Sequence, residues 1–135
     1  MKILFLCRGN IGRSQIAEAF YNSLTHSKNA ISAGTIVRHP GKTVEESDKD
    51  GLVVRCMREG GIDISQKVRK KVTVEMTKDV DNIIVMAELE TVPEFIKKNK
   101  KSIFWEIKDP QGESYSMYCN ARDEIKRRVK ALIKQ

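Results

Sequence analysis

The first fourteen residues of the chain hold a cysteine and an arginine that enclose a short loop containing two glycines. Cys7 and Arg13 stand six positions apart, and Ser14 follows the arginine directly. Backbone N–H groups in such a loop and in the first turn of a following helix attract negative charge. The same field favours the thiolate, which is the nucleophilic form of a cysteine. The spacing therefore predicts a cup for a phosphate-like oxyanion, with a nucleophile inside it.

The residue types within the loop suit this chemistry. Gly9 and Gly12 allow the backbone to approach an anion closely, and the planar fork of Arg13 holds two oxygens of a tetrahedral oxyanion. Ser14 is placed to donate a hydroxyl hydrogen bond to the cysteine sulfur. We predict that phosphate is bound by the loop as a whole, which comprises Arg8, Gly9, Asn10, Ile11, Gly12, Arg13 and Ser14.

Two flanking segments must position this loop. Residues 3–6 form an unbroken apolar run, which is typical of a strand buried on both faces of a parallel sheet. Beyond the loop, apolar residues recur on one face at helical spacing, namely Ile16, Ala17, Phe20, Tyr21 and Leu24. Cys7 is therefore expected at the point where a strand gives way to a helix.

The rest of the chain alternates between expected strands and helices. We expect strands over residues 29–33, 81–86 and 102–107, and helices over 44–60, 91–99 (from a capping box at Thr91) and 116–133. This alternation predicts an α/β fold, with a four-stranded parallel sheet, helices on both faces and the phosphate-binding loop after the first strand. The length of 135 residues fits a single domain. Cys56 lies on the apolar face of its helix and is expected in the core.

A candidate general acid follows the fourth expected strand. Ligands of parallel sheets bind beyond the carboxyl ends of the strands. The first strand delivers Cys7 to that edge, and the fourth delivers Asp109 and Pro110. Proline biases the preceding residue toward an extended backbone, which aims the Asp109 carboxylate out of the loop. We therefore expect Asp109 to protonate a leaving group opposite the nucleophile.

The frame Cys-x-Gly-Asn-Ile-x-Arg-Ser, placed directly after a first strand, resembles the low-molecular-weight protein tyrosine phosphatase family. The resemblance extends over nearly the whole chain and implies one phosphatase-like domain over residues 1–135. It implies hydrolysis of phosphomonoesters through a phosphocysteine intermediate, with Cys7, Arg13 and Asp109 catalytic. It also implies that Asn10 braces the loop together with Ser14 and Ser32. The segment 61–65 resembles the connection that a short helix follows in the family.

Composition limits the other roles of the chain. The net charge is +7, but its basic clusters are scattered and no aromatic residues lie among them, so we expect no nucleic-acid partner. Three cysteines and two histidines without ligand spacing predict no metal, and the chemistry needs no cofactor. No apolar run is long enough for a membrane span, which makes the cytoplasm the expected location. The expected partner is a phosphorylated protein or a small phosphomonoester, with a monomer as the default.

The chain departs from the family pattern at two places. Many members carry a second cysteine where this chain has Gly12, and two tyrosines after the Asp-Pro pair, where this chain has Gln111 and Gly112. Thioredoxin-coupled arsenate reductases share the scaffold, which makes arsenate reduction the second hypothesis. Those enzymes need two further cysteines close together, and residues 72–93 contain none. A phosphate-binding or nucleic-acid-binding module without turnover is the third hypothesis.

Overall fold

A four-stranded parallel sheet forms the centre of the structure, a computed structural model that describes residues 1–135. The strands β1 (Ile3–Cys7), β2 (Ala30–Gly34), β3 (Asn82–Val85) and β4 (Ser102–Phe104) lie in the order β2-β1-β3-β4. All three pairings are parallel. Because β1 is an inner strand, each of its five residues is buried. The predicted α/β fold, with its parallel sheet and its loop after the first strand, is confirmed.

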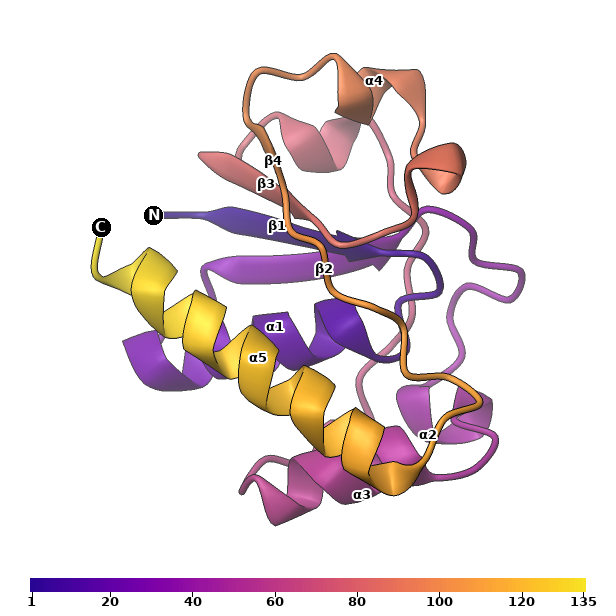
Figure 1. Ribbon diagram of the computed structural model, residues 1–135. Helices are drawn as coiled ribbons and strands as arrows, with labels where there is room; N and C mark the ends of the chain where they lie inside the picture. The colour runs from indigo at the N-terminus through magenta and orange to yellow at the C-terminus, as the bar shows by residue number, and fades with distance from the viewer.

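Helices cover the sheet on both faces (Figure 1). On one face lie α1 (Arg13–Thr25), α3 (Leu52–Glu59) and α5 (Tyr115–Ile133), and on the other lies the short α4 (Glu94–Lys97). The core is divided accordingly, because successive side chains of a strand point to opposite faces. Phe5 packs in the larger cluster under α1 and α5, whereas Leu4 and Leu6 pack in the smaller cluster. This division explains why the first strand is apolar throughout.

The helix expected over residues 44–60 is divided into α2 (Val44–Ser47) and α3. The break has two causes. The Asp48 carboxylate accepts hydrogen bonds from the backbone N–H groups of Val53 and Val54, at 3.5 and 3.0 Å, and so caps α3. Gly51 has a φ of 73°, in the left-handed region that interrupts a helix. The turn between α2 and α3 consequently projects residues 48–50 toward the carboxyl edge of the sheet.

Three other expectations were wrong in extent or type. Residues 66–72 form no helix but an extended segment that reaches β2, where the Gly34 N–H donates to the Lys70 carbonyl at 2.8 Å. The capping box at Thr91 is absent, because its hydroxyl donates to the Glu88 carbonyl at 2.7 Å, and α4 begins only at Glu94. Strand β4 stops at Phe104.

The helical faces were predicted well, with one exception. Leu24 is 39% exposed near the end of α1, whereas the other four expected core residues of that helix are buried. In α5 we expected one apolar face from helical spacing, at Tyr118, Ala121, Ile125, Val129 and Leu132; all are buried except Ala121, which is partly buried. Cys56 is fully buried, and burial raises the pKa of its thiol to about 11. No helix of the structure is long and apolar enough to cross a membrane.

Candidate functional site

Asn10 is the centre of a buried hydrogen-bond network that holds the loop between β1 and α1. Its Nδ2 donates to Ser14 Oγ at 2.8 Å and to Ser32 Oγ at 3.0 Å. Its Oδ1 accepts from the Lys70 N–H at 2.8 Å and from Gln15 Nε2 at 3.2 Å. The network holds Asn10 in the left-handed region, at a φ of 55°. Asparagine tolerates that region better than most residues, which suits it to this position.

The direction of each hydrogen bond in this network is fixed by a buried carboxylate. Glu18 accepts from the Ser32 hydroxyl at 3.0 Å and forms an ion pair with Lys67. Because Ser32 donates to Glu18, it accepts from Asn10, and Asn10 donates its other proton to Ser14. The Ser14 hydroxyl proton is then left for the Cys7 sulfur, 3.0 Å from Ser14 Oγ. The network therefore presents a hydrogen-bond donor to Cys7, which stabilises a thiolate.

The loop lies directly on the end of β2. A Cβ atom built on Gly34 would stand 2.7 Å from the Arg8 carbonyl oxygen and 3.0 Å from the Asn10 nitrogen. The backbone of Thr35 also donates to the Cys7 carbonyl at 2.9 Å, and that of Ile36 to the Arg8 carbonyl at 2.9 Å. This close approach requires glycine at position 34.

Arg13 is buried, with 3% exposure, and is held by three acceptors at the carboxyl edge of the sheet. One terminal nitrogen donates to the carbonyls of Met86 and Ile107, at 2.6 and 3.0 Å. Both terminal nitrogens reach the Glu88 carboxylate, at 2.9 and 3.1 Å. Burial lowers the pKa of Arg13, but the Glu88 hydrogen bond and the charges of Cys7 and Asp109 outweigh it, so the pKa is raised overall. The guanidinium is thus fixed in position and always charged.

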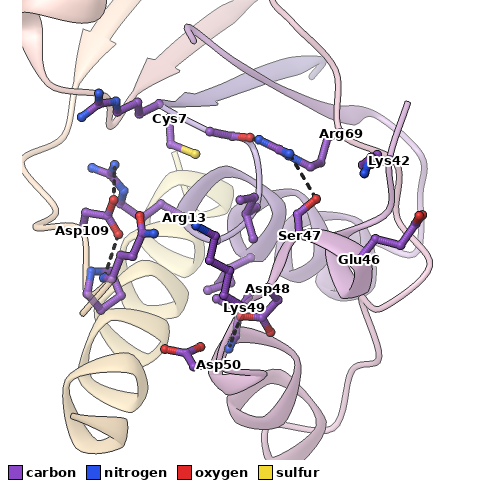
Figure 2. Close-up of a pocket in the computed structure, with 18 of the residues that line it drawn as sticks. Cys7, Arg13, Lys42, Glu46, Ser47, Asp48, Lys49, Asp50, Arg69 and Asp109 are labelled. Carbon is purple, nitrogen blue, oxygen red and sulfur yellow. Dashed lines mark hydrogen bonds and ion pairs between the residues drawn. The ribbon is translucent and has the colours of Figure 1, made fainter. Parts of the chain in front are cut away.

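Asp109 lies beside Arg13, as the topology predicted. One carboxylate oxygen is 3.5 Å from a terminal nitrogen of Arg13, and the other accepts from the Gln111 N–H at 3.0 Å. The Asp109 side chain is 40% exposed, so water and a ligand can reach it. Figure 2 shows the Cys7 sulfur pointing into the same open space that Asp109 borders from the side opposite Arg69.

These side chains surround a cavity of about 680 Å³. The loop contributes part of its wall, and most of the rest comes from the segment 36–42, residues 46–50, Arg69 and the segment 109–111. Arg69 is itself held in place, donating to the Gly9 carbonyl at 3.0 Å and to Ser47 Oγ at 3.1 Å. The cavity is much larger than a phosphate ion, which leaves room for the group that carries the phosphate.

The structure brings nearly all the predicted residues to one place, in two layers. The cavity is lined by Cys7, Arg8, Gly9, Ile11, Gly12, Arg13 and Asp109. Asn10, Ser14 and Ser32 are fully buried behind the loop and do not line the cavity. The second layer therefore supports the first, and only the backbone of Asn10 and Ser14 is in a position to contribute to the cup.

Sequence reasoning missed Glu88, Arg69 and the ion pair of Glu18 with Lys67. Glu88 follows the third strand by three residues, so the rule that placed Asp109 at the carboxyl edge also applies to it. Arg69 and Lys67 reach the loop from an extended segment that we expected to be helical. The structure contains no group of three or more His, Cys, Asp or Glu side chains that could hold a metal ion.

A strand, a Cys-x5-Arg loop and a helix at the edge of a parallel sheet, with an aspartate beside the arginine, define a class of small phosphatase-like proteins. Residues 2–135 match the family model described as low molecular weight phosphotyrosine protein phosphatase. The chain belongs to this family, so the resemblance of the loop sequence is confirmed over essentially the whole chain.

Individual relatives carry two kinds of name. An arsenate reductase of Brevibacillus brevis is 31% identical over 130 residues, covering 95% of this chain and 90% of the relative. A glutaredoxin arsenate reductase of Synechocystis is 29% identical, covering 98% and 95%. Vibrio vulnificus Wzb, solved in complex with benzylphosphonate, is 25% identical with a TM-score of 0.84, covering 98% of this chain and 97% of that one. The relatives therefore include both arsenate reductases and a protein solved with an aromatic phosphonate.

Proposed function

We propose that the protein is a phosphomonoester hydrolase acting through a phosphocysteine intermediate, and that its substrates are phosphotyrosine residues of proteins. The observation that carries this proposal is the placement of Cys7 and Asp109 on one cavity, with the buried guanidinium of Arg13 beside both. A nucleophile, a fixed positive charge and an acid around one space are the groups that phosphoryl transfer needs. The benzylphosphonate bound by the Wzb relative is an aromatic phosphonate, which supports an aromatic phosphoester.

In the first step the Cys7 thiolate attacks phosphorus, forming the S–P bond as the P–O bond to the leaving group breaks. Arg13 and the loop N–H groups hold the equatorial oxygens, whose charge is greatest in the transition state. Asp109, in its protonated form, gives its proton to the leaving oxygen, so that no strong anion is expelled. The Ser14 hydroxyl, 3.0 Å from the sulfur, favours the thiolate before attack and again when it leaves.

In the second step a water attacks the phosphocysteine. Asp109, now ionised, accepts the proton of this water, the new O–P bond forms and the S–P bond breaks. Inorganic phosphate and the Cys7 thiolate are released, and Asp109 has regained its proton. The same carboxyl group serves as acid and then as base because both the leaving oxygen and the attacking water occupy its side of phosphorus.

Arsenate reduction is the second candidate, because the B. brevis and Synechocystis relatives carry that name. The first step would be similar, with arsenate in place of the phosphoester, but reduction then needs further thiols to accept the oxidising equivalents. Cys56 is fully buried, Cys119 is on α5, and neither lines the cavity. The cavity holds no second cysteine that could form a disulfide with Cys7, which favours hydrolysis.

Hydrolysis of p-nitrophenyl phosphate by the wild type and by Cys7→Ser tests the proposal, in the presence of a chelator and from pH 5 to 8. We expect turnover in the wild type and a loss on the order of 10⁴-fold or more in the variant, because a serine hydroxyl is not ionised at these pH values. A parallel assay supplies arsenate with thioredoxin, or with glutathione and glutaredoxin. Reduction of arsenate without hydrolysis of the phosphoester would reject the proposal in favour of the second candidate.

A further inference from the structure

The charged groups that line the cavity are paired unevenly. Each of the four lining carboxylates already has an intramolecular partner: Glu46 caps α2, Asp48 caps α3, Asp50 accepts from Tyr118 and Asp109 lies beside Arg13. Four lining cations have none: Arg8, next to Cys7, and three at the rim of the cavity. These rim cations, Arg38, Lys42 and Lys49, are exposed and form no ion pair or side-chain hydrogen bond. The lining holds six arginine and lysine side chains against four carboxylates, so the cavity carries an excess of positive charge that suits an anionic ligand.

Two arginines nearer the loop add to this imbalance. Arg69 is partly buried and contacts only the Gly9 carbonyl and Ser47 Oγ, so no carboxylate neutralises it. Burial lowers the pKa of Arg69, and the charge of Cys7 acts in the opposite direction, which places Arg69 within the field of the phosphate loop. Arg8 is exposed and likewise has no carboxylate within ion-pair distance. A partly buried cation without a counter-ion favours an anionic ligand.

The rim cations do not converge on one point. Arg38 and Lys42 come from the segment between β2 and α2, whereas Lys49 comes from the turn between α2 and α3. Figure 2 shows Lys42 beyond Arg69 and Lys49 on a different side of the cavity, below the Cys7 sulfur. Cations on different sides of the cavity suit a chain that passes through it better than a single small anion. Of the aromatic side chains that could contact a phosphotyrosine ring, the cavity has only Tyr118. This residue is buried and donates to Asp50.

From this arrangement we propose that the substrate is an acidic segment of a phosphorylated protein, with Asp or Glu side chains on both sides of the phosphorylated residue that pair with Arg38, Lys42 and Lys49. The inference rests on the proposed phosphatase activity and names its substrate class. Selection by charge replaces selection by aromatic contact, and it acts both on the rate of encounter and on the stability of the complex.

Two phosphotyrosine peptides that differ only in three flanking residues, Glu in one and Gln in the other, test the proposal. At low salt we expect kcat/KM to be about ten-fold higher for the Glu peptide, since several weak exposed ion pairs act together. At about 0.5 M salt the ratio should fall toward one, because exposed charges are then screened. Lys42→Gln and Lys49→Gln should each lower the ratio, with p-nitrophenyl phosphate hydrolysis within about two-fold of the wild type.

The matched control is Lys28→Gln, which removes the same charge at the amino end of β2, away from the cavity, and should leave the peptide ratio unchanged. A ratio near one in a wild type that hydrolyses p-nitrophenyl phosphate overturns the inference and leaves the proposed function intact. A ratio that persists in the double variant Lys42→Gln/Lys49→Gln overturns the role of the rim. If the wild type shows no turnover, the proposed function fails. The charge preference is then decided by the binding of the two peptides to Cys7→Ser, measured by fluorescence anisotropy.

Discussion

The phosphate loop and the rim of the same cavity are built in opposite ways. Behind the loop, Asn10, Ser14 and Ser32 are fully buried, and each side chain has its hydrogen-bond partners within the protein. At the rim, Arg38, Lys42 and Lys49 are exposed and have none. A group that is already held loses little entropy when the ligand arrives, whereas each mobile rim side chain must be ordered. Under the two proposals made above, the loop serves the reaction and the rim serves the choice of substrate.

After Cys7→Ser, the largest effect is expected from Asp109→Asn, which keeps the shape of the side chain but removes its proton. We expect kcat for a phosphoester with a poor leaving group to fall by about 10²- to 10⁴-fold. The loss should be much smaller for p-nitrophenyl phosphate, whose leaving group needs less protonation. Equal losses for both substrates, measured by steady-state kinetics, would show that Asp109 has another role.

A smaller effect is expected from Glu88→Gln, which weakens the support of Arg13. We expect KM for p-nitrophenyl phosphate and the inhibition constant of phosphate to rise about ten-fold, because a charge-assisted bidentate contact fixes the arginine fork. Charge alone predicts the opposite, since removal of a nearby negative charge favours an anion. Tighter binding of phosphate by the variant would therefore mean that Glu88 acts through its negative charge and not by positioning Arg13.

The same pair predicts a dependence of stability on pH. Partial burial raises the pKa of Glu88, but the hydrogen bond from Arg13 outweighs it, and the pKa is lowered overall. The stabilisation from this pair is therefore present above the ordinary glutamate pKa and is lost as pH falls through the lowered value. We expect the difference in urea midpoint between wild type and Glu88→Gln to be largest near pH 7 and to shrink below about pH 4. A constant difference across that range would contradict the pairing.

Gly34→Ala tests whether the loop depends on the strand beneath it. The added methyl group would stand 2.5 Å from Val37 Cγ2 and 2.7 Å from the Arg8 carbonyl, so the loop must shift. We expect a loss of stability of about 1–3 kcal/mol, the usual cost of overpacking, together with weaker binding of phosphate. Gly9→Ala is the control for stability, because its Cβ would meet nothing closer than 3.7 Å. Equal denaturation midpoints for the two variants would argue against this contact.

The smallest effect is expected at the rim. Arg38→Gln should change kcat/KM for p-nitrophenyl phosphate by less than about two-fold, because one exposed charge contributes little to a small substrate. A loss comparable to that of Glu88→Gln would mean that the rim takes part in the reaction, and the contrast between the two regions would fail.

The accuracy of the sequence-based expectations follows the same division. Cys7, Arg13 and the elements around them were placed correctly because a strand, a loop and a helix that adjoin in sequence define them. Asp109 was placed by the rule for parallel sheets. Glu88 was missed although the same rule applies to it, because the rule was applied only to the first and fourth strands. Arg69 was missed because the segment that carries it was expected to be helical. The break at Gly51 was missed because the apolar spacing that predicted the helix lies entirely after it, at Val53, Cys56 and Met57, and was extended back over residues 45–51, which contain no apolar side chain. Only the Asp48 cap shows where α3 begins.

Gly12 leaves the loop without a second thiol that could react with an oxidised Cys7. A Cβ atom at this position would meet only Val53, at 3.7 Å, so the glycine is not required by lack of space. Peroxide converts a thiolate first to a sulfenic acid, which a neighbouring thiol can trap as a disulfide before irreversible oxidation. With glycine at position 12, that rescue must come from small thiols in solution. We therefore expect recovery of the oxidised protein to depend on the concentration of small thiols around it and not on its own loop.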